Sequence, residues 1–293
     1  MTDRTGESNM PVVAARGLSK HYRRFPALVD TSFEIPLGRI VGVIGANGAG
    51  KTTMLSAILG LIPYEGEVRV LGRDPLRERD RLMNEVSFIA DVATLPRFMR
   101  VDQLLDYVEG VHPKFARQRT EDFLKRTKIP PTKRIKALSK GMVTQLHLAI
   151  VMGIDAKLLV LDEPTLGLDI LFRKAFYRDL LEDYFDAGRT IIVTTHQVEE
   201  VEHILTDVMF IANGRIVFES PVDELPSRFA ELAVTPDKLE AARALHPIHE
   251  RTTLGQPVLV FENPDREALK ALGTVRGMTL ADIFVAKVSG DTA

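Results

Sequence analysis

The stretch that most constrains this chain is residues 45–52, which read GANGAGKT and match the pattern G-x-x-x-x-G-K-[ST]. Residues 40–44, directly before it, form a short apolar run rich in β-branched side chains, which predicts a buried strand. After it, residues 53–59 have the composition of a helix. Strand, glycine-rich loop and helix in this order are the context in which the pattern binds phosphate, so we favour a phosphate-binding loop over an ordinary glycine-rich turn.

The residue types in this loop suit a nucleotide triphosphate. Glycines let successive backbone N–H groups point at one phosphate, and the positive end of the helix dipole adds to that attraction. Lys51 can reach the β- and γ-phosphates, and the Thr52 hydroxyl can ligate Mg²⁺. The residues that we expect to contact ATP here are Gly45, Asn47, Gly48, Ala49, Gly50, Lys51, Thr52 and Thr53.

The composition is that of an ordinary globular protein. The 293 residues hold 38 Lys and Arg against 40 Asp and Glu, a balance that gives no reason to expect nucleic acid as a partner. The absence of Cys excludes disulfides, thiolate nucleophiles and thiolate metal sites. The longest run without charge, residues 141–154, is too short to span a bilayer, so a membrane role would require a partner. Residues 1–10 are polar, lack the apolar core of a signal peptide, and are expected to be disordered.

Alternating strand and helix patterns predict an α/β fold with a largely parallel sheet. Further strands are predicted at residues 12–15, 32–35, 66–70, 86–90, 157–162 and 190–194, and a hairpin at residues 208–218 turns on Asn213 and Gly214. Residues 101–153 have helical periodicity, which predicts a helical subdomain, over about residues 91–153, inserted into the sheet domain. A basic stretch at residues 125–140 could bind phosphates or lipid headgroups, but we favour a solvated helix face.

A further helix of the sheet domain is predicted at residues 171–187. After residue 222 the alternation of strand and helix patterns ends, and a helix is predicted at residues 239–245. Residues 252–261 predict two short strands, and Thr279 to Asp282 predict a capping box that opens a last helix. We therefore expect a core domain over residues 1–222, with a mixed sheet and the inserted helical subdomain, and a small α+β appendage over residues 223–293.

Two carboxylates end the strand predicted at residues 157–162. Asp162 can hold the Mg²⁺ that bridges the β- and γ-phosphates, and Glu163 can orient or polarise the attacking water. An Asp-Glu pair at a strand end can also be merely solvated. The four bulky apolar residues before it, downstream of a phosphate loop, favour the functional interpretation.

Residues 11–220 resemble the ATP-binding subunit of an ATP-binding cassette (ABC) transporter. The resemblance is carried by six motifs in family order: the phosphate loop, the second Walker motif at residues 158–163, a signature-like Leu138-Ser139-Lys140-Gly141-Met142, a D-loop at residues 167–169, a switch histidine at His196 and an aromatic at Tyr22. The form of the signature resembles the single-domain ATPases of bacterial ABC-2-type exporters. The resemblance implies a P-loop NTPase core that hydrolyses ATP with Mg²⁺.

The resemblance also implies roles for residues outside the phosphate loop. Tyr22 would stack on adenine, although an aromatic near a strand is often part of the core. Lys51, Glu163 and His196 would form the catalytic set, with His196 meeting the γ-phosphate. Two copies, or a heterodimer with a related ATPase, would close head to tail, so that Ser139 and Gly141 of one subunit meet the γ-phosphate held by the other.

The chain departs from the family pattern at several positions. Asp91 stands at the position of the Q-loop glutamine, where its carboxylate can still ligate Mg²⁺ alongside Thr52 and Asp162. Lys140, Met142 and Ile170 replace a glycine, a glutamine and a proline. None of these changes removes a residue needed for hydrolysis. His147, on the apolar helix after the signature, is interpreted as structural.

The function that we predict is the ATPase subunit of a transporter, bound to the cytoplasmic face of the membrane through a separate integral permease and driving export. The alternative is a soluble ABC-type ATPase that acts on ribosomes or DNA. Relatives that act on ribosomes usually carry two cassettes in tandem, and chromosome-type relatives carry a long coiled coil between the Walker motifs. This chain has one cassette and no long heptad run.

Overall fold

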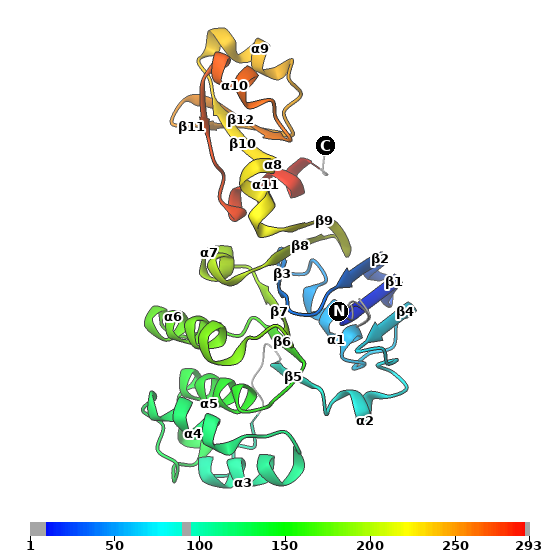
Figure 1. Ribbon diagram of the computed structural model, residues 1–293, viewed down its shortest axis with the longest axis vertical. Coiled ribbons are helices and arrows are strands. Elements are labelled where there is room, and N and C mark those ends of the chain that lie inside the picture. The colour runs from blue at the N-terminus through cyan, green and yellow to red at the C-terminus, as the bar shows by residue number, and fades with distance from the viewer. Residues whose placement is uncertain (1–9, 90–94, 291–293) are drawn as a thin grey trace, which may run out of the picture.

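The computed structural model describes residues 10–89 and 95–290, and its centre is a six-stranded sheet (Figure 1). The strands of this sheet, in spatial order, are β5 (Val86–Ile89), β6 (Leu158–Asp162), β7 (Thr190–Thr195), β3 (Ile40–Ile44), β8 (Asp207–Ala212) and β9 (Arg215–Pro221). The first five are parallel and β9 is antiparallel to β8. Strands β3, β6 and β7 are buried along their whole length, as their apolar sequences require. The predicted α/β fold with a mixed sheet is confirmed.

The hairpin predicted at Asn213 and Gly214 joins β8 to β9. Both residues have positive φ, 50° and 74°, which is the geometry of a two-residue turn that follows the twist of its strands.

A second, antiparallel sheet covers the helix that follows the phosphate loop. Its strands, in the order β2-β1-β4, are β1 (Val13–Tyr22), β2 (Phe25–Ile35) and β4 (Glu65–Val70). Helix α1 (Lys51–Ile58) buries Met54, Leu55 and Ile58 in a core that it shares with β1, β3 and β4. This packing places helix α1 between the two sheets, with the loop at its N-terminal end (Figure 1).

The helical subdomain lies between β5 and β6 in sequence and at one end of the molecule (Figure 1). Its helices are α3 (Val101–Val111), α4 (Arg117–Lys125) and α5 (Lys140–Met152). Short α2 (Arg79–Leu82) precedes β5. In the basic stretch most side chains are exposed, as predicted, but the stretch is not a helix face: α4 ends at Lys125, α5 begins at Lys140, and the described residues between them form only the short 3-10 turn Ile135–Ala137. Arg126 reaches the buried Asp179.

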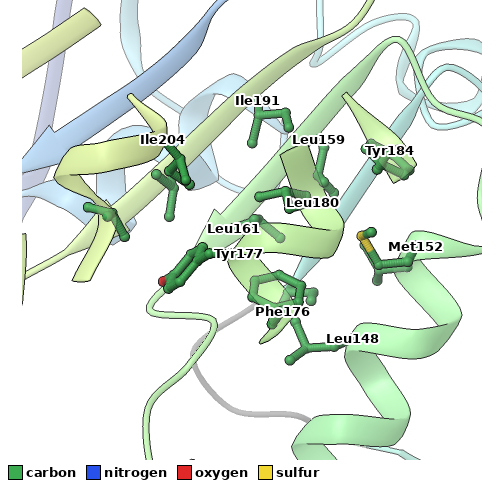
Figure 2. Packing of buried hydrophobic residues seen from close by; sticks show 14 of the residues in the cluster. Leu148, Met152, Leu159, Leu161, Phe176, Tyr177, Leu180, Tyr184, Ile191 and Ile204 are labelled. Carbon is green, nitrogen blue, oxygen red and sulfur yellow. The ribbon is translucent and has the colours of Figure 1, made fainter. Parts of the chain in front are cut away.

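The helix predicted at residues 171–187 is shorter and less regular than expected. Helix α6 spans Ile170–Asp179 and continues as one π-helical segment, Leu180–Tyr184. Figure 2 shows Phe176 and Leu180 packed against Leu159 and Leu161 of β6, with Leu148 and Met152 of α5 on the other side. Burial of Tyr184, whose hydroxyl donates to the carbonyl of Ile154, accompanies the wider last turn.

The C-terminal appendage is a four-stranded antiparallel sheet with short helices. Its strands, in the order β11-β12-β10-β13, are β10 (Phe229–Ala233), β11 (His249–Thr253), β12 (Gln256–Glu262) and β13 (Thr274–Arg276). Its helices are α8 (Leu225–Arg228), α9 (Leu239–Arg243), α10 (Arg266–Leu272) and α11 (Leu280–Gly290). The helix near residue 239, the two strands near residue 252 and the last helix all agree with the sequence-based expectation. At Thr279 the hydroxyl accepts from the N–H of Asp282, which is one arm of the predicted capping box.

Helix α11 returns from the appendage to the central core. The rings of Phe284 and Phe210 meet edge to face, with centroids 5.3 Å apart. The backbone N–H of Leu280 donates to Glu202, just after helix α7 (Val198–Val201). Leu280 and Ile283 belong to the same buried cluster as β6 and β7. In residues 10–89 and 95–290, no helix combines the length and apolar character that crossing a bilayer demands.

Candidate functional site

The conformation of the loop between β3 and α1 depends on its glycines. Gly48 and Gly50 have φ of 82° and 112°, values that side chains with a Cβ rarely adopt. A Cβ at Gly45 would lie 2.5 Å from the carbonyl oxygen of Ile211, and one at Gly50 would lie 2.6 Å from that of Ala27. Gly48 has nothing within 4 Å of its Cβ position, so the loop is packed on its inner side and open at its tip.

Lys51 is a buried cation at the first turn of α1. Its side chain is folded back under the loop, where Nζ donates to the carbonyls of Gly45 at 2.7 Å and Ala46 at 3.3 Å. The carboxylate oxygen Oε1 of Glu163 lies 3.7 Å from the same Nζ. The loop and the end of β6 therefore meet at Lys51, as the two motifs in the sequence led us to expect.

A cleft of about 240 Å³ runs along the loop. The residues that line it are Tyr22, Phe25, Ala27, Ala46, Asn47, Gly48, Gly50, Lys51, Thr52, Thr53 and Glu163. Gly45 and Ala49 stand behind this lining: Gly45 supplies a carbonyl to Lys51, and the Ala49 N–H donates to Ala46 within the loop. A larger cleft, about 630 Å³, lies between β2 and β9 and is lined by other residues.

Aromatic side chains form the outer end of the cleft. Tyr22 and Phe25 face each other in the register of the β1–β2 hairpin, and their exposed fractions are 47% and 58%. Lys20 places its Nζ 5.1 Å from the centroid of the Tyr22 ring. Exposed rings at the mouth of a cleft offer a surface on which a planar base can stack. The sequence indicated Tyr22 alone, and Phe25 would have been found by pairing the two sides of the hairpin.

Asp162 and Glu163 are tied to the neighbouring strand by one threonine. Thr194 is the partner of Asp162 in the β6–β7 register. Its hydroxyl donates to Oδ1 of Asp162 at 2.5 Å and accepts from the N–H of Glu163 at 3.1 Å. Thr194 thereby fixes both acids at once. No motif in the sequence indicates this residue, and its place at the end of a buried strand rich in threonine is the one signal that could have found it.

Glu163 has an unusual backbone conformation. Its φ is 46°, in the left-handed region that costs a residue with a Cβ about 1–3 kcal/mol and is concentrated at functional sites. The conformation turns its side chain between two groups: Oε1 faces Lys51, and Oε2 lies 2.9 Å from Nδ1 of His196. The predicted set of Lys51, Glu163 and His196 is therefore a contiguous group in the structure.

The signature-like motif lies elsewhere. Ser139 is the N-cap of α5, where its hydroxyl accepts from the N–H of Met142 at 3.2 Å, and Gly141 follows in the first turn. Neither residue is among those that line the cleft beside Lys51. Asp169 caps α6 by accepting from the N–H of Phe172 at 3.0 Å. Asp91, the residue expected at the Q-loop position, lies outside the described residues, as do residues 1–9.

The site contains two kinds of binding group, one for phosphate and one for a metal ion. The loop supplies a cation and backbone groups that suit phosphate. Thr52, exposed beside the cleft, and Asp162, only 4% exposed at the end of β6, supply the hydroxyl and carboxylate oxygens that Mg²⁺ prefers. This donor set fits a Mg²⁺ ion bound together with a triphosphate.

His147 lies outside this site. Its Nδ1 is buried, and within the described residues it has no hydrogen-bond partner. Burial lowers the pKa of His147 to about 4, so the ring is neutral at physiological pH. This environment agrees with the structural role that the sequence indicated.

Comparison with known proteins relates the fold to transporters. Residues 28–166 match the family described as ABC transporter. The ABC transporter ATP-binding protein YtrB of Bacillus subtilis (strain 168) is 24% identical over 288 residues, which cover 95% of this chain and 99% of YtrB. The Nod factor export ATP-binding protein I of Ralstonia nicotianae is 30% identical over 284 residues, covering 94% of this chain and 88% of that protein.

A solved structure shares the fold at lower identity. It is the dimeric, post-hydrolysis state of an ATP-binding cassette bound to ADP and Pi, and it is 20% identical. The two superpose with a TM-score of 0.61 over 72% of this chain and 98% of that one.

Proposed function

Because the chain belongs to the ATP-binding proteins of ABC transporters, we propose that it hydrolyses ATP to drive transport through a separate membrane permease. The activity of the family is ATP hydrolysis, and the structure contains an ABC-type ATPase core. The observation that carries the proposal is the position of Glu163. Its carboxylate lies beside the buried Lys51 of the phosphate loop and within hydrogen-bond distance of His196.

The proposed division of labour follows from these contacts. The loop, Lys51 and Thr52 bind the phosphates, while Tyr22 stacks on the base. Glu163 accepts a proton from the attacking water or polarises it, and His196, oriented by Glu163, meets the γ-phosphate. A Mg²⁺ held by Thr52 and Asp162 would neutralise charge on the β- and γ-phosphates. Asp91 is proposed as a further metal-side acid on the sequence alone.

A second subunit would complete the site. Ser139 and Gly141 stand at the start of α5, a helix of 13 residues whose N-terminal N–H groups suit an anion, and they are not part of the cleft lining of their own chain. We propose that two copies, or this chain and a related ATPase, close head to tail on ATP. The fold relative described above is a dimer, which supports this arrangement.

The partner and direction of transport come from the relatives. One relative is named as an export protein and another as an ABC transporter ATP-binding protein, which supports a permease partner, attachment to the cytoplasmic face of the membrane, and export. These names do not favour the alternative of a soluble ATPase that acts on ribosomes or DNA. The core over residues 1–222 would do the chemistry, and residues 223–293 would form an accessory domain.

The experiment that tests the proposal is co-purification. The tagged chain is recovered from a mild-detergent extract of its own cells, with a preparation of the Lys51→Ala variant in parallel. We expect an integral membrane protein in both preparations and Mg-ATP hydrolysis in the wild type only. Recovery of ribosomes or DNA, with no membrane protein, would contradict the transporter assignment.

A further inference from the structure

A polar cluster includes Gln197, the residue that follows His196, and Arg173 is at its centre. Arg173 lies in the first half of α6, and 22% of its side chain is exposed. Its Nε donates to the carbonyl of Leu168 at 2.8 Å. One guanidinium nitrogen donates to the side-chain oxygen of Gln197 at 2.8 Å and also pairs with the carboxylate of Glu200.

The three partners come from two separate segments of the chain. Leu168 precedes Asp169 in the loop that follows Glu163, and it is 4% exposed. Gln197 and Glu200 follow His196 and open α7. The guanidinium therefore joins the segment after β6 to the segment after β7, and the nearest residue on the second segment is adjacent to His196 in sequence.

Further hydrogen bonds join the partners of Arg173 to residues on both segments. Glu200 also accepts from the hydroxyl of Thr165 at 3.5 Å, and Thr165 shares a hydrogen bond of 3.2 Å with the buried hydroxyl of Tyr177. The N–H of Gln197 donates to the hydroxyl of Thr195 at 2.9 Å. The loop after Glu163 and the loop carrying His196 are thus connected through side chains, besides their contact at Glu163 itself.

Only an arginine suits this place. The acceptors lie on a backbone carbonyl, an amide and a carboxylate, and a planar guanidinium presents its N–H groups in several fixed directions. A lysine ammonium could neutralise Glu200, but its donors diverge from a single atom. It cannot also reproduce the two hydrogen bonds that Arg173 makes to Leu168 and Gln197.

We propose that Arg173 is a positioning residue, which keeps His196 in hydrogen-bond contact with Glu163 by holding the two loops together. It makes no contact with the cleft beside Lys51, so it acts on turnover and not on nucleotide binding. This inference rests on the proposed ATPase function of the Glu163–His196 pair. Small misplacement of reacting groups can reduce a rate by up to about 100-fold, which sets the scale of the expected effect.

The test uses the full chain with Mg-ATP and measures turnover and nucleotide affinity separately. We expect Arg173→Ala to lower kcat by about 10- to 100-fold while the Kd for ATP stays at the wild-type value. Arg178→Ala is the matched control, because Arg178 lies on the same helix, is 57% exposed at its side chain, and pairs only with Asp179 and Glu182 among the described residues. The control should match the wild type in both measurements.

A second background separates positioning from a general structural role. If Arg173 acts through His196, then Arg173→Ala should cost little further turnover in a His196→Ala chain. An equal fold-loss in both backgrounds would overturn the proposal. If Arg173→Ala does not fold, Arg173→Lys decides: it keeps a charge opposite Glu200, and we expect it to fold and still lose turnover. Full turnover in Arg173→Lys would also overturn the proposal.

Failure of this inference can be told from failure of the proposed function. A wild-type chain that turns over ATP, together with an unimpaired Arg173→Ala chain, contradicts only the role of Arg173. A wild-type chain that binds no ATP and has no turnover contradicts the function, and the inference falls with it.

Discussion

The Oε2 atom of Glu163 lies 2.9 Å from Nδ1 of His196. An ionised carboxylate can only accept a hydrogen bond, so the partner of Glu163 must be the protonated Nδ1 of the ring. That assignment follows from the chemistry of the pair and leaves Nε2 as the other ring nitrogen, which can donate to a phosphate oxygen only when both ring nitrogens are protonated. The acid that is proposed to act on water thus also orients the neighbouring imidazole through Nδ1.

Replacement of Lys51 should nearly abolish turnover. Lys51→Ala removes a buried ammonium that is held by two loop carbonyls and faces Glu163. Loss of one such electrostatic group commonly costs about 10²–10³ in kcat, and nucleotide binding should weaken as well. Phosphate release by the purified chain checks this, with the exposed Lys128→Ala as control. Equal turnover by the wild type and Lys51→Ala would contradict the assignment of the ATPase site to this loop.

Phe25 should contribute to nucleotide binding alongside Tyr22. Phe25→Ala removes one exposed ring from the cleft, and aromatic stacking is worth about 0.5–1.5 kcal/mol. We expect the KM for ATP to rise about 3- to 10-fold with kcat unchanged, because the contact is equal in the ground and transition states. Phe98→Ala is the control, since Phe98 is 71% exposed and is not part of the cleft lining. An unchanged KM in Phe25→Ala would leave Tyr22 as the sole stacking partner.

His147 should make stability depend on pH. Its pKa is lowered by burial to about 4 in the folded chain, against 6.5 as its ordinary value. Between these two pH values the unfolded chain binds a proton that the folded chain does not, so stability falls as pH falls through this window. The loss attributable to this group is at most about 3 kcal/mol.

Urea unfolding at pH 7 and at pH 5 measures this effect. His147→Gln should lose less stability than the wild type over that interval. His203→Gln, at an exposed histidine, should behave as the wild type does. Identical pH slopes for the wild type and His147→Gln would show that the buried ring does not control the dependence.

The structural features that could be predicted from the sequence are those that a few adjacent residues determine. The phosphate loop, the buried strand before Asp162 and the turn at Asn213 each carry their conformation in a few adjacent residues, and the structure contains all three. The end of α6 was misjudged because periodicity continues past Asp179. The wider π-helical turn depends instead on the packing of Tyr184 against the carbonyl of Ile154, which is 30 residues away in sequence.

Contacts between distant segments could not be predicted in this way. Nothing local to Thr194 indicates that its hydroxyl joins Asp162 to Glu163, because the register of β6 and β7 decides it. The same holds for Arg173, whose partners come from two loops. The antiparallel pairing of β1 with β4 is also a long-range choice, so the separate three-stranded sheet was not foreseen.

The appendage should be attached to the core and not independent of it. Phe284 of α11 packs edge to face on Phe210 of β8. Phe284→Ala should therefore destabilise the whole chain by about 2 kcal/mol, which is below the range for a fully buried ring because Phe284 is partly exposed. Val285→Ala, at the neighbouring side chain that is 47% exposed, should have little effect. Two separate unfolding transitions, with only the weaker one shifted by Phe284→Ala, would show that the appendage unfolds on its own.

Glu163→Gln should bind ATP, dimerise and then stall. Glutamine keeps the size of the side chain and an oxygen that can accept from His196, so the 2.9 Å contact and the hydrogen bond of the residue 163 N–H to Thr194 can persist. Phosphate binding rests on Lys51, Thr52 and the loop, which the change leaves in place. What disappears is the carboxylate that accepts a proton from water, a contribution of about 10²–10⁴ in rate, or roughly 3–5 kcal/mol of barrier.

Removing a negative charge beside Lys51 and the γ-phosphate should also favour closure of the dimer. Gel filtration with Mg-ATP should therefore show a lasting dimer for Glu163→Gln and mostly monomer for the wild type. Turnover by Glu163→Gln near the wild-type rate would assign the orientation of water to another group, with His196 as the first candidate.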